Sequence, residues 1–126
     1  MRRAATWIGW ALLLAAQAVA TTNYVTPTGG GLLDGSSWTD ARSNIQAAVT
    51  ACAAPGDVIY FQSGTYAISH QVTLSNRRDL SLRGGYQGSG TPGPLGGTTI
   101  LARNPSYTVR ILYGNACTVR LDRITV

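Results

Sequence analysis

The sequence predicts an all-β solenoid of parallel strands with one short helix at its N-terminal end. Its 126 residues contain ten Arg but no Lys, and five Asp but no Glu. Lys and Glu are strong helix formers, so their absence argues for little helix. Short strand-like runs separated by turn residues fill the chain from Val58 onward, and aliphatic residues recur in them at a nearly regular spacing. A regular period of this kind is typical of repeat architectures.

The composition is that of one folded domain. A chain of 126 residues suffices for a single domain of roughly 100 to 150 residues. Charged residues make up 12% of the chain, about half the usual share of roughly 25%, while Val, Ile, Leu and Tyr are common. The net charge of +5 comes from scattered arginines without interleaved aromatic residues, so it does not indicate nucleic-acid binding.

Residues 1–20 have the organisation of a secretory signal peptide. Two arginines precede an apolar stretch at residues 7–16, and Ala18-Val19-Ala20 fits the small-residue cleavage pattern. The apolar stretch is shorter than the roughly 20 residues that cross a bilayer, so we expect cleavage after Ala20 rather than a membrane anchor. The mature chain would then have no membrane span and would be exported to the extracellular space, the cell surface or the periplasm.

Residues 21–57 are expected to form an N-terminal cap that contains the helix, over about residues 43–53. An apolar face is formed at helical spacing by Ile45, Ala48, Val49 and Cys52. Ser43, three residues before Gln46, predicts a capping box at the start, and Pro55-Gly56 ends the helix. A short helix with one apolar face must lie on another element, and it suits the open end of a solenoid as a cover.

Residues 58–126 are expected to form about three coils of the solenoid. Nearly equal lengths of chain separate four aliphatic residues, which are Val58, Leu80, Ile100 and Leu121. Each coil would stack on the previous one and bury a column of aliphatic side chains. A β-sandwich is the alternative, since its strands also recur at short, regular intervals. The strand-like runs are 58–61, 71–74, 80–82, 98–101, 108–111, 118–121 and 124–126.

Several motifs in a fixed order resemble a known family. They are Asp34-Gly35-Ser36-Ser37-Trp38, Ile45-Gln46-Ala47-Ala48-Val49, Pro55-Gly56-Asp57-Val58-Ile59-Tyr60-Phe61, Gly64-Thr65-Tyr66 and Leu80-Ser81-Leu82-Arg83-Gly84-Gly85-Tyr86. The set resembles the N-terminal cap and first coils of secreted right-handed parallel β-helix proteins, the pectate-lyase-like superfamily, and of bacterial surface proteins of similar fold. The resemblance implies a right-handed solenoid. It is specific for a fold and not for an activity. From the chemistry of the motifs we expect Trp38 beneath the helix and Gly64-Thr65-Tyr66 at a corner between strands. Residues 87–97 are rich in Gly and Pro, so we expect them to form a projecting loop.

The two cysteines, Cys52 and Cys117, have two interpretations. In an oxidising compartment they could form the one disulfide that two cysteines allow. Cys52 also lies on the apolar face of the helix and Cys117 at the start of a strand, where free cysteines serve as small core residues. The sequence leaves both interpretations open.

Candidate contact residues are arginines and tyrosines. A periodic solenoid could align Arg103, Arg110, Arg120 and Arg123 on one face that attracts an acidic polymer such as a uronate, although solvated strand positions explain them equally. A sugar-stacking platform or ordinary strand packing would account for Tyr60, Tyr66, Tyr86, Tyr107 and Tyr113. The single histidine, His70, has no recognisable catalytic partner.

No catalytic constellation and no cofactor site is recognisable. The resemblance implies that relatives which cleave acidic polysaccharides bind calcium through clustered acidic residues, several coils into the helix. Asp57 and Asp79 are separated by the length of one expected coil and could stack two carboxylates in this way, but their turn contexts favour hydrogen bonds to the local backbone. We therefore expect no cofactor here, and calcium only in a longer protein.

The sequence thus favours an exported, non-catalytic N-terminal part of an extracellular or surface β-helix protein whose loops bind a polysaccharide or a cell-surface partner. The alternative is the cap region of a pectin-type polysaccharide lyase or glycoside hydrolase whose active site lies in further coils. The chain stops in the strand-like residues 123–126 without a C-terminal cap. We therefore expect a fragment of a longer protein, or self-association through the open C-terminal coil.

Overall fold

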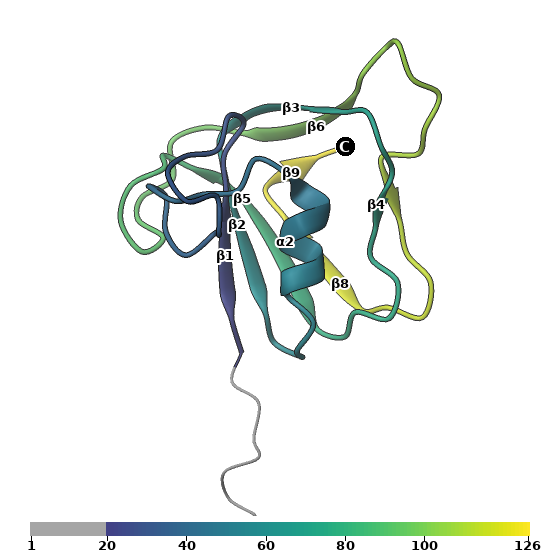
Figure 1. Ribbon diagram of the computed structural model, residues 1–126, viewed down its shortest axis with the longest axis horizontal. Coiled ribbons are helices and arrows are strands. Elements are labelled where there is room, and N and C mark those ends of the chain that lie inside the picture. The colour runs from purple at the N-terminus through teal and green to yellow at the C-terminus, as the bar shows by residue number, and fades with distance from the viewer. Residues whose placement is uncertain (1–19) are drawn as a thin grey trace, which may run out of the picture.

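In the computed structural model, which describes residues 20–126, nine short strands and one helix follow one another along the chain (Figure 1). In chain order they are β1 (Thr22–Val25), α2 (Ile45–Ala51), β2 (Val58–Gln62), β3 (Gly64–Ile68), β4 (Val72–Thr73), β5 (Leu80–Tyr86), β6 (Thr99–Arg103), β7 (Leu112–Tyr113), β8 (Val119–Asp122) and β9 (Ile124–Thr125).

The strands form three short sheets in which every pair is parallel. Sheet A has the order β1-β2-β5-β8, sheet B has the order β3-β6-β9, and sheet C consists of β4 and β7. Figure 1 shows the sheets around a common interior, and α2 contacts β1 and β4. The structure is therefore a small β-rich domain with one short helix.

Alternation of side chains along the strands explains how the sheets share a core. In β2, Ile59 and Phe61 are fully buried, whereas Tyr60 between them is only partly buried. Ile59 is in register with Leu82 of β5, which is also fully buried. Since successive side chains of a strand point to opposite faces, Ile59 and Phe61 lie on the inner face of sheet A and Tyr60 lies on its outer face. Residues of α2 and of all three sheets join them in one hydrophobic cluster.

The expected fold class, a right-handed parallel β-helix built of coils of one length, is wrong. Over residues 20–126 the structure shows three short sheets of parallel strands and does not show a solenoid. Val58 pairs with Ser81, and about one expected period of chain separates these two residues. Leu80 pairs with Val119, however, and nearly two expected periods separate them. Ile100 lies in sheet B, so the residues that suggested a regular period do not occupy equivalent positions.

The apparent period has a simple physical origin. All three sheets face one core, so buried aliphatic residues recur at the spacing of successive strands, whichever sheet a strand joins. Segments of unequal length separate the strands, among them residues 87–98 before β6 and residues 104–111 before β7. The spacing of hydrophobic residues alone therefore does not distinguish a repeat from separate sheets around one core.

The helix lies where the sequence predicts it, but its N-terminus is built differently. Its buried residues are Ile45, Ala48 and Val49, as expected. The N-cap is Asn44, whose side chain accepts a hydrogen bond from the backbone N–H of Ala47 at 3.0 Å. Asn is among the best N-cap residues, and with Asn44 in that place the expected capping box of Ser43 and Gln46 is not formed.

Gln46 instead holds the neighbouring strand. Its side-chain carbonyl accepts a hydrogen bond from the Thr73 N–H at 2.7 Å, and its amide donates to the Thr73 carbonyl at 3.2 Å. Thr73 belongs to β4, whose single neighbour among the described strands is β7. Gln46 therefore supplies partners for backbone groups that the sheet leaves unpaired.

The two edges of sheet A differ. Residues 35–42 cover the outer edge of β1: the Tyr24 N–H donates to the Gly35 carbonyl, and the Arg42 N–H donates to the Tyr24 carbonyl, each at 2.9 Å. At the other edge, β8 pairs with β5 alone among the described strands. Sheet A thus has one covered edge and one open edge.

Of the predicted signal peptide, residues 1–19 lie outside the described part of the chain. In residues 20–126, no helix has the length and apolar character needed to span a bilayer. The expected cap region and the strands after it share one core, because β1 pairs directly with β2.

Candidate ligand-binding face

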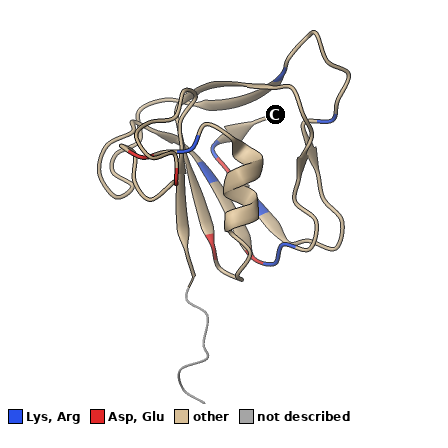
Figure 2. Cartoon of the chain, in the orientation of Figure 1, with Lys and Arg blue, Asp and Glu red and all other residues tan. Residues whose placement is uncertain are grey.

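The outer face of sheet A carries a row of aromatic and charged side chains. The register places Tyr24 of β1 beside Tyr60 of β2, Tyr60 beside Arg83 of β5, and Arg83 beside Asp122 of β8. Figure 2 shows arginine and aspartate positions on the strands of this sheet. Because aliphatic residues alternate with them on the inner face, all four side chains lie on the outer face.

Four aromatic rings form a closed group at one end of this row, the aromatic quartet of Tyr24, Trp38, Tyr60 and Tyr86. Their ring centroids are 4.7 Å apart for Tyr24 and Trp38, 6.2 Å for Trp38 and Tyr86, 5.1 Å for Tyr86 and Tyr60, and 5.6 Å for Tyr60 and Tyr24. Edge-on and tilted pairs at such distances are favourable. Tyr24 and Tyr86 are buried, whereas Trp38 and Tyr60 remain partly exposed and offer ring surface to a ligand.

Burial makes Tyr24 of the quartet less acidic. It raises the pKa of the Tyr24 phenol above the ordinary value of 10.0, and the neighbouring Tyr60 phenol acts in the same direction. Near pH 7 the Tyr24 phenol is therefore uncharged, and it adds apolar ring surface to the quartet.

Two Gly-rich loops, residues 28–40 and 87–97, meet at the quartet. Figure 1 shows them side by side, and the Trp38 indole N–H donates to the Pro92 carbonyl at 2.9 Å. The expectation that Trp38 packs beneath α2 is therefore wrong, since its ring contacts Tyr24 and Tyr86 on the opposite face of sheet A. The partly buried indole needs an acceptor, and the Pro92 carbonyl supplies it there. Residues 89–91 and 93–97 are exposed, as expected for a projecting loop.

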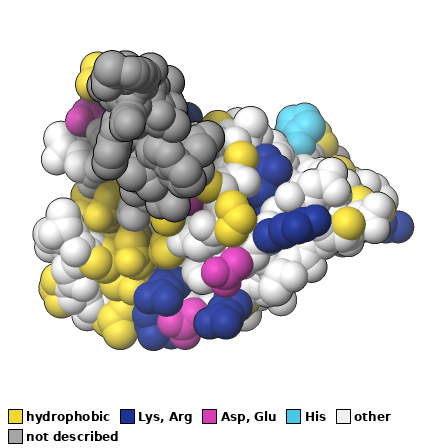
Figure 3. Space-filling model, turned by 90° about the horizontal axis from the view of Figure 1, so that it is seen from below, with side chains coloured by type: hydrophobic (Ala, Val, Ile, Leu, Met, Phe, Trp, Pro, Cys, Tyr) yellow, Lys and Arg dark blue, Asp and Glu magenta, His cyan; other side chains and the backbone are white. Residues whose placement is uncertain are grey.

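Arginines lie at the other end of the face. An open depression of about 430 Å³ is lined by Ser81, Arg83, Arg120, Leu121 and Asp122. Arg83 and Arg120 are exposed and outnumber the single carboxylate of Asp122. In the view of Figure 3, a hydrophobic area of the surface borders a group of arginine and aspartate side chains. The face therefore combines partly exposed aromatic rings with exposed positive charge.

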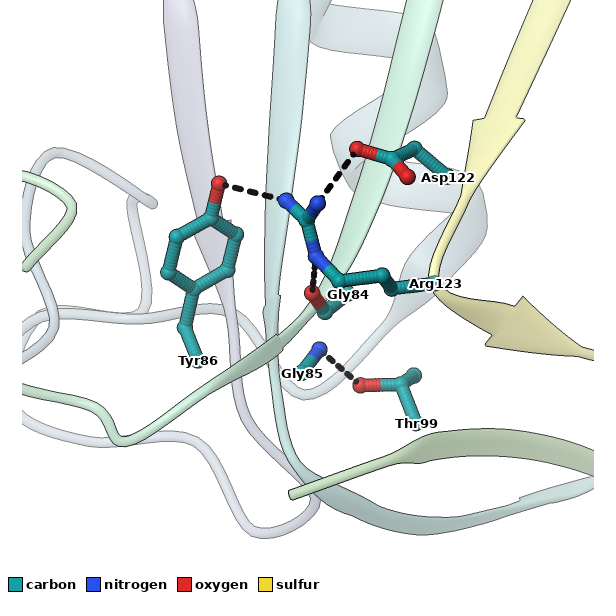
Figure 4. Close-up of polar contacts among 6 residues, drawn as sticks. All are labelled: Gly84, Gly85, Tyr86, Thr99, Asp122 and Arg123. Atoms are coloured by element: carbon teal, nitrogen blue, oxygen red, sulfur yellow. Dashed lines mark hydrogen bonds and ion pairs between the residues drawn. The ribbon is translucent and has the colours of Figure 1, made fainter. Parts of the chain in front are cut away.

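Arg123 is held by the fold at the corner between sheets A and B. Its guanidinium donates to the Gly84 carbonyl at 3.2 Å and to the Tyr86 hydroxyl at 3.3 Å, and pairs with Asp122 at 2.9 Å (Figure 4). Gly84 permits this close approach, because a Cβ atom there would lie 2.6 Å from the Arg123 carbonyl oxygen. Arg123 thus braces the quartet at Tyr86.

The structure does not gather the four predicted arginines on one face. Arg103 ends β6 in sheet B, and Arg110 precedes β7 with its guanidinium carbon 5.4 Å from the Tyr113 ring centroid. Arg120 lies on the outer face of sheet A, and Arg123 is bonded at the corner. The prediction assumed a regular repeat, and without one these residues fall on different sheets.

The tyrosines separate in the same way. Tyr60 and Tyr86 join the quartet, while Tyr107 and Tyr113 lie exposed outside it. Tyr66 packs in the core against Phe61, with its hydroxyl 2.8 Å from the Gln62 carbonyl oxygen. Burial raises the pKa of the Tyr66 phenol well above its ordinary value.

Sequence reasoning missed two residues of the quartet and the central arginine. Arg83 carried a detectable signal, since Leu80 and Leu82 alternate with Ser81 and Arg83 in a strand-like run and Arg83 so points away from the core. For Tyr24 the signal was weaker, because only Val25 beside it is aliphatic. Trp38 carried no such signal, because it belongs to a loop whose path depends on the contact with Pro92.

His70 borders a groove of about 610 Å³ between the start of α2 and the segment from β3 to β4. It is exposed, with its ring centroid 6.0 Å from that of Tyr107. Within the described residues, the other side chains that line this groove are uncharged. Asn44 and Gln46, two of its polar residues, already bind backbone groups.

Asp57 and Asp79 lie in different environments. Asp57 is buried and accepts hydrogen bonds from the backbone N–H groups of Thr21 at 2.6 Å and Ala54 at 3.0 Å. Asp79 is exposed in a turn, with a positive φ of 51°. Over residues 20–126, no group of three or more His, Cys, Asp or Glu side chains is placed to hold a metal ion.

Cys52 and Cys117 are both free cysteines in the structure. Cys52 is buried at the end of α2, where burial and the nearby Asp57 carboxylate raise the pKa of its thiol. Cys117 is partly buried and packs against the same core. These positions suit small core residues, and the disulfide between the two stays a prediction.

Comparison of the chain with protein-family models, curated proteins and solved structures finds no match. The resemblance to the pectate-lyase-like superfamily thus stays a prediction, and the candidate face rests on its own geometry.

Proposed function

We propose that this chain is an exported, non-catalytic binding domain and that the outer face of sheet A binds an acidic glycan. The observation that supports the proposal is the row across four parallel strands in which the aromatic quartet is followed directly by Arg83. Arg120 lies on the same face, one strand further on.

The two halves of the face suit the two halves of a uronic-acid unit. The rings of Tyr60 and Trp38 are each partly exposed, and the C–H face of a sugar ring can stack on an aromatic ring of this kind. The Arg83 guanidinium offers a planar pair of N–H donors that fits a carboxylate. Neighbouring strands lie about 4.8 Å apart, so Tyr60 and Arg83 can contact the ring and the carboxylate of one sugar unit.

The proposal predicts a dependence on salt. Both arginines are exposed, so their attraction for a carboxylate is screened over a Debye length of about 8 Å at physiological ionic strength. Stacking on the quartet is much less sensitive to salt. Binding should therefore weaken, but not vanish, between low and high ionic strength.

The test is calorimetric titration of the full chain with a uronic-acid oligosaccharide and with a neutral oligosaccharide of equal length. We expect Arg83→Gln to weaken binding of the acidic ligand about tenfold or more, since hydrogen bonds to charged groups contribute about 1.5–3 kcal/mol. Tyr60→Ala should weaken binding of both ligands. The matched control, Arg103→Gln, removes an exposed arginine from sheet B and should leave binding unchanged.

Circular dichroism of each variant separates loss of binding from loss of fold. A folded Arg83→Gln variant that binds the acidic ligand like the wild type would refute the proposal. Equal affinity of the wild type for the acidic and the neutral ligand would refute it as well.

A further inference from the structure

We propose that two copies of this chain associate through the free edge of β8, in an antiparallel pairing centred on Leu121. The inference goes beyond the proposed function, because it concerns the edge of sheet A and needs no ligand. It rests on the unpaired edge, on the direction of its backbone groups and on the order of its charges.

The free edge of β8 contrasts with the covered edge of β1. Residues 35–42 pair with the backbone of β1, whereas β8 has β5 as its single neighbour among the described strands. An unpaired edge presents a row of N–H and C=O groups that can template a further strand.

The contacts with β5 show which backbone groups of β8 point outward. The Leu80 N–H donates to the Thr118 carbonyl at 3.1 Å. Residues of a parallel strand direct their backbone groups alternately to one side and the other. The N–H and C=O of Arg120 therefore face β5, and those of Val119 and Leu121 face the free edge.

This alternation restricts the register of an added copy. In an antiparallel pair, two directly opposite residues either exchange both backbone hydrogen bonds or exchange neither. Leu121 opposite Leu121 of a second copy meets this condition, because both residues direct their N–H and C=O toward the interface between the two β8 strands. A shift of one residue would place these groups opposite backbone groups that point away.

The charges of β8 favour the same register. With Leu121 at the centre, Arg120 lies opposite Asp122 of the second copy, and Asp122 lies opposite Arg120. Centring the pair on Arg120 or on Asp122 would place like charges opposite each other, which is destabilising. A twofold pairing repeats every contact, so the strand is complementary to itself.

The inner face of the edge has apolar surface to cover. Leu121 is in register with the buried Leu82, yet it is 47% exposed. Val119 and Ile124 pack against the core but are only partly buried. The interface formed by the two β8 strands is short, and small interfaces form weak complexes. We therefore expect a reversible dimer with a Kd in the micromolar range or above.

Sedimentation of the full chain without any glycan tests the inference. Arg120→Asp and Asp122→Arg each turn two attractive contacts into repulsive ones, and each should weaken dimerisation about tenfold or more. An equimolar mixture of the two variants should restore it, since one copy then carries two Asp and the other two Arg. Arg103→Asp, an equal change of charge on sheet B, is the control and should dimerise like the wild type.

A second variant covers the case in which a reversed charge impairs folding. Leu121→Ser keeps the charges, removes the self-contact and should also weaken dimerisation. A wild-type chain that stays monomeric at all concentrations would overturn the inference. So would a mixture of the two charge variants that associates no better than either alone. Because no glycan is present, failure here is distinguishable from failure of the glycan proposal.

Discussion

Single buried polar side chains decide which distant segments of this chain lie together. The Thr99 hydroxyl accepts a hydrogen bond from the Gly85 N–H at 2.9 Å (Figure 4). It also donates to the Gln62 carbonyl at 3.0 Å, and so joins sheets A and B. In residues 20–126, every buried side-chain nitrogen or oxygen has a partner. An unpaired buried group costs about 1–3 kcal/mol, so these contacts make alternative arrangements of the sheets unfavourable.

The buried Tyr66 should make the stability of the protein depend on pH. Burial holds its phenol pKa well above the ordinary value of 10.0, so the unfolded chain releases this proton first and the folded chain keeps it. Stability present below about pH 10 is then lost as the pH rises, by at most about 1.4 kcal/mol per pH unit for one proton. We expect Tyr66→Phe to flatten this decline in urea unfolding measured between about pH 8 and about pH 11.

The exposed Tyr113 provides the control, because Tyr113→Phe should leave the decline unchanged. Equal slopes for the wild type and Tyr66→Phe would show that this phenol titrates alike in both states.

At the scale of elements, two neighbouring residues, Ser43 and Asn44, are candidates for the N-cap of α2. The Asn44 side chain bonds the Ala47 N–H, whereas the adjacent Ser43 is the cap that the sequence pattern predicts. We expect Asn44→Ala to lower the free energy of unfolding by about 1 kcal/mol and Ser43→Ala by less than about 0.5 kcal/mol. Urea denaturation of both variants measures the difference. A larger loss of unfolding free energy for Ser43→Ala would instead support a capping box formed by Ser43 and Gln46.

The helix and most strands could be predicted because the patterns that indicate them involve residues close together in the sequence. The helix expected over about residues 43–53 spans Ile45–Ala51. The corner expected at Gly64-Thr65-Tyr66 lies at Gly64, which takes a φ of 136° and is separated from the end of β2 by one residue. Thr65 and Tyr66 already belong to β3. No strand forms over the expected residues 108–111, and β7 follows at Leu112–Tyr113.

At the scale of the whole molecule, we expect export with cleavage after Ala20, so that Thr21 begins the mature chain. The Thr21 backbone nitrogen lies 2.6 Å from an oxygen of the buried Asp57 carboxylate. Cleavage would turn this amide into an ammonium group and strengthen the contact by adding charge. Intact mass and N-terminal sequence of the exported protein measure the cleavage site.

Two variants sharpen this prediction. Ala20→Leu should reduce cleavage, because the site requires a small residue, whereas Ala16→Leu in the apolar stretch should not. An exported chain that still carries residues 1–20 would contradict it.

The sequence by itself determined the local features of this protein: the scarcity of helix, the position of α2, most strands and the outward direction of Tyr60 and Arg83. Each depends on residues a few positions apart, through side-chain alternation, helical spacing and turn residues. The sheet that each strand joins was decided only by the tertiary structure, as Ile100 in sheet B shows.

The candidate face was decided by the tertiary structure as well. Its quartet unites rings from residues 24, 38, 60 and 86, and the parallel pairs that align them join segments far apart in the chain. The physical reason is that parallel strands need long connections, whose lengths and packing set the register. Local sequence patterns do not encode those long-range contacts.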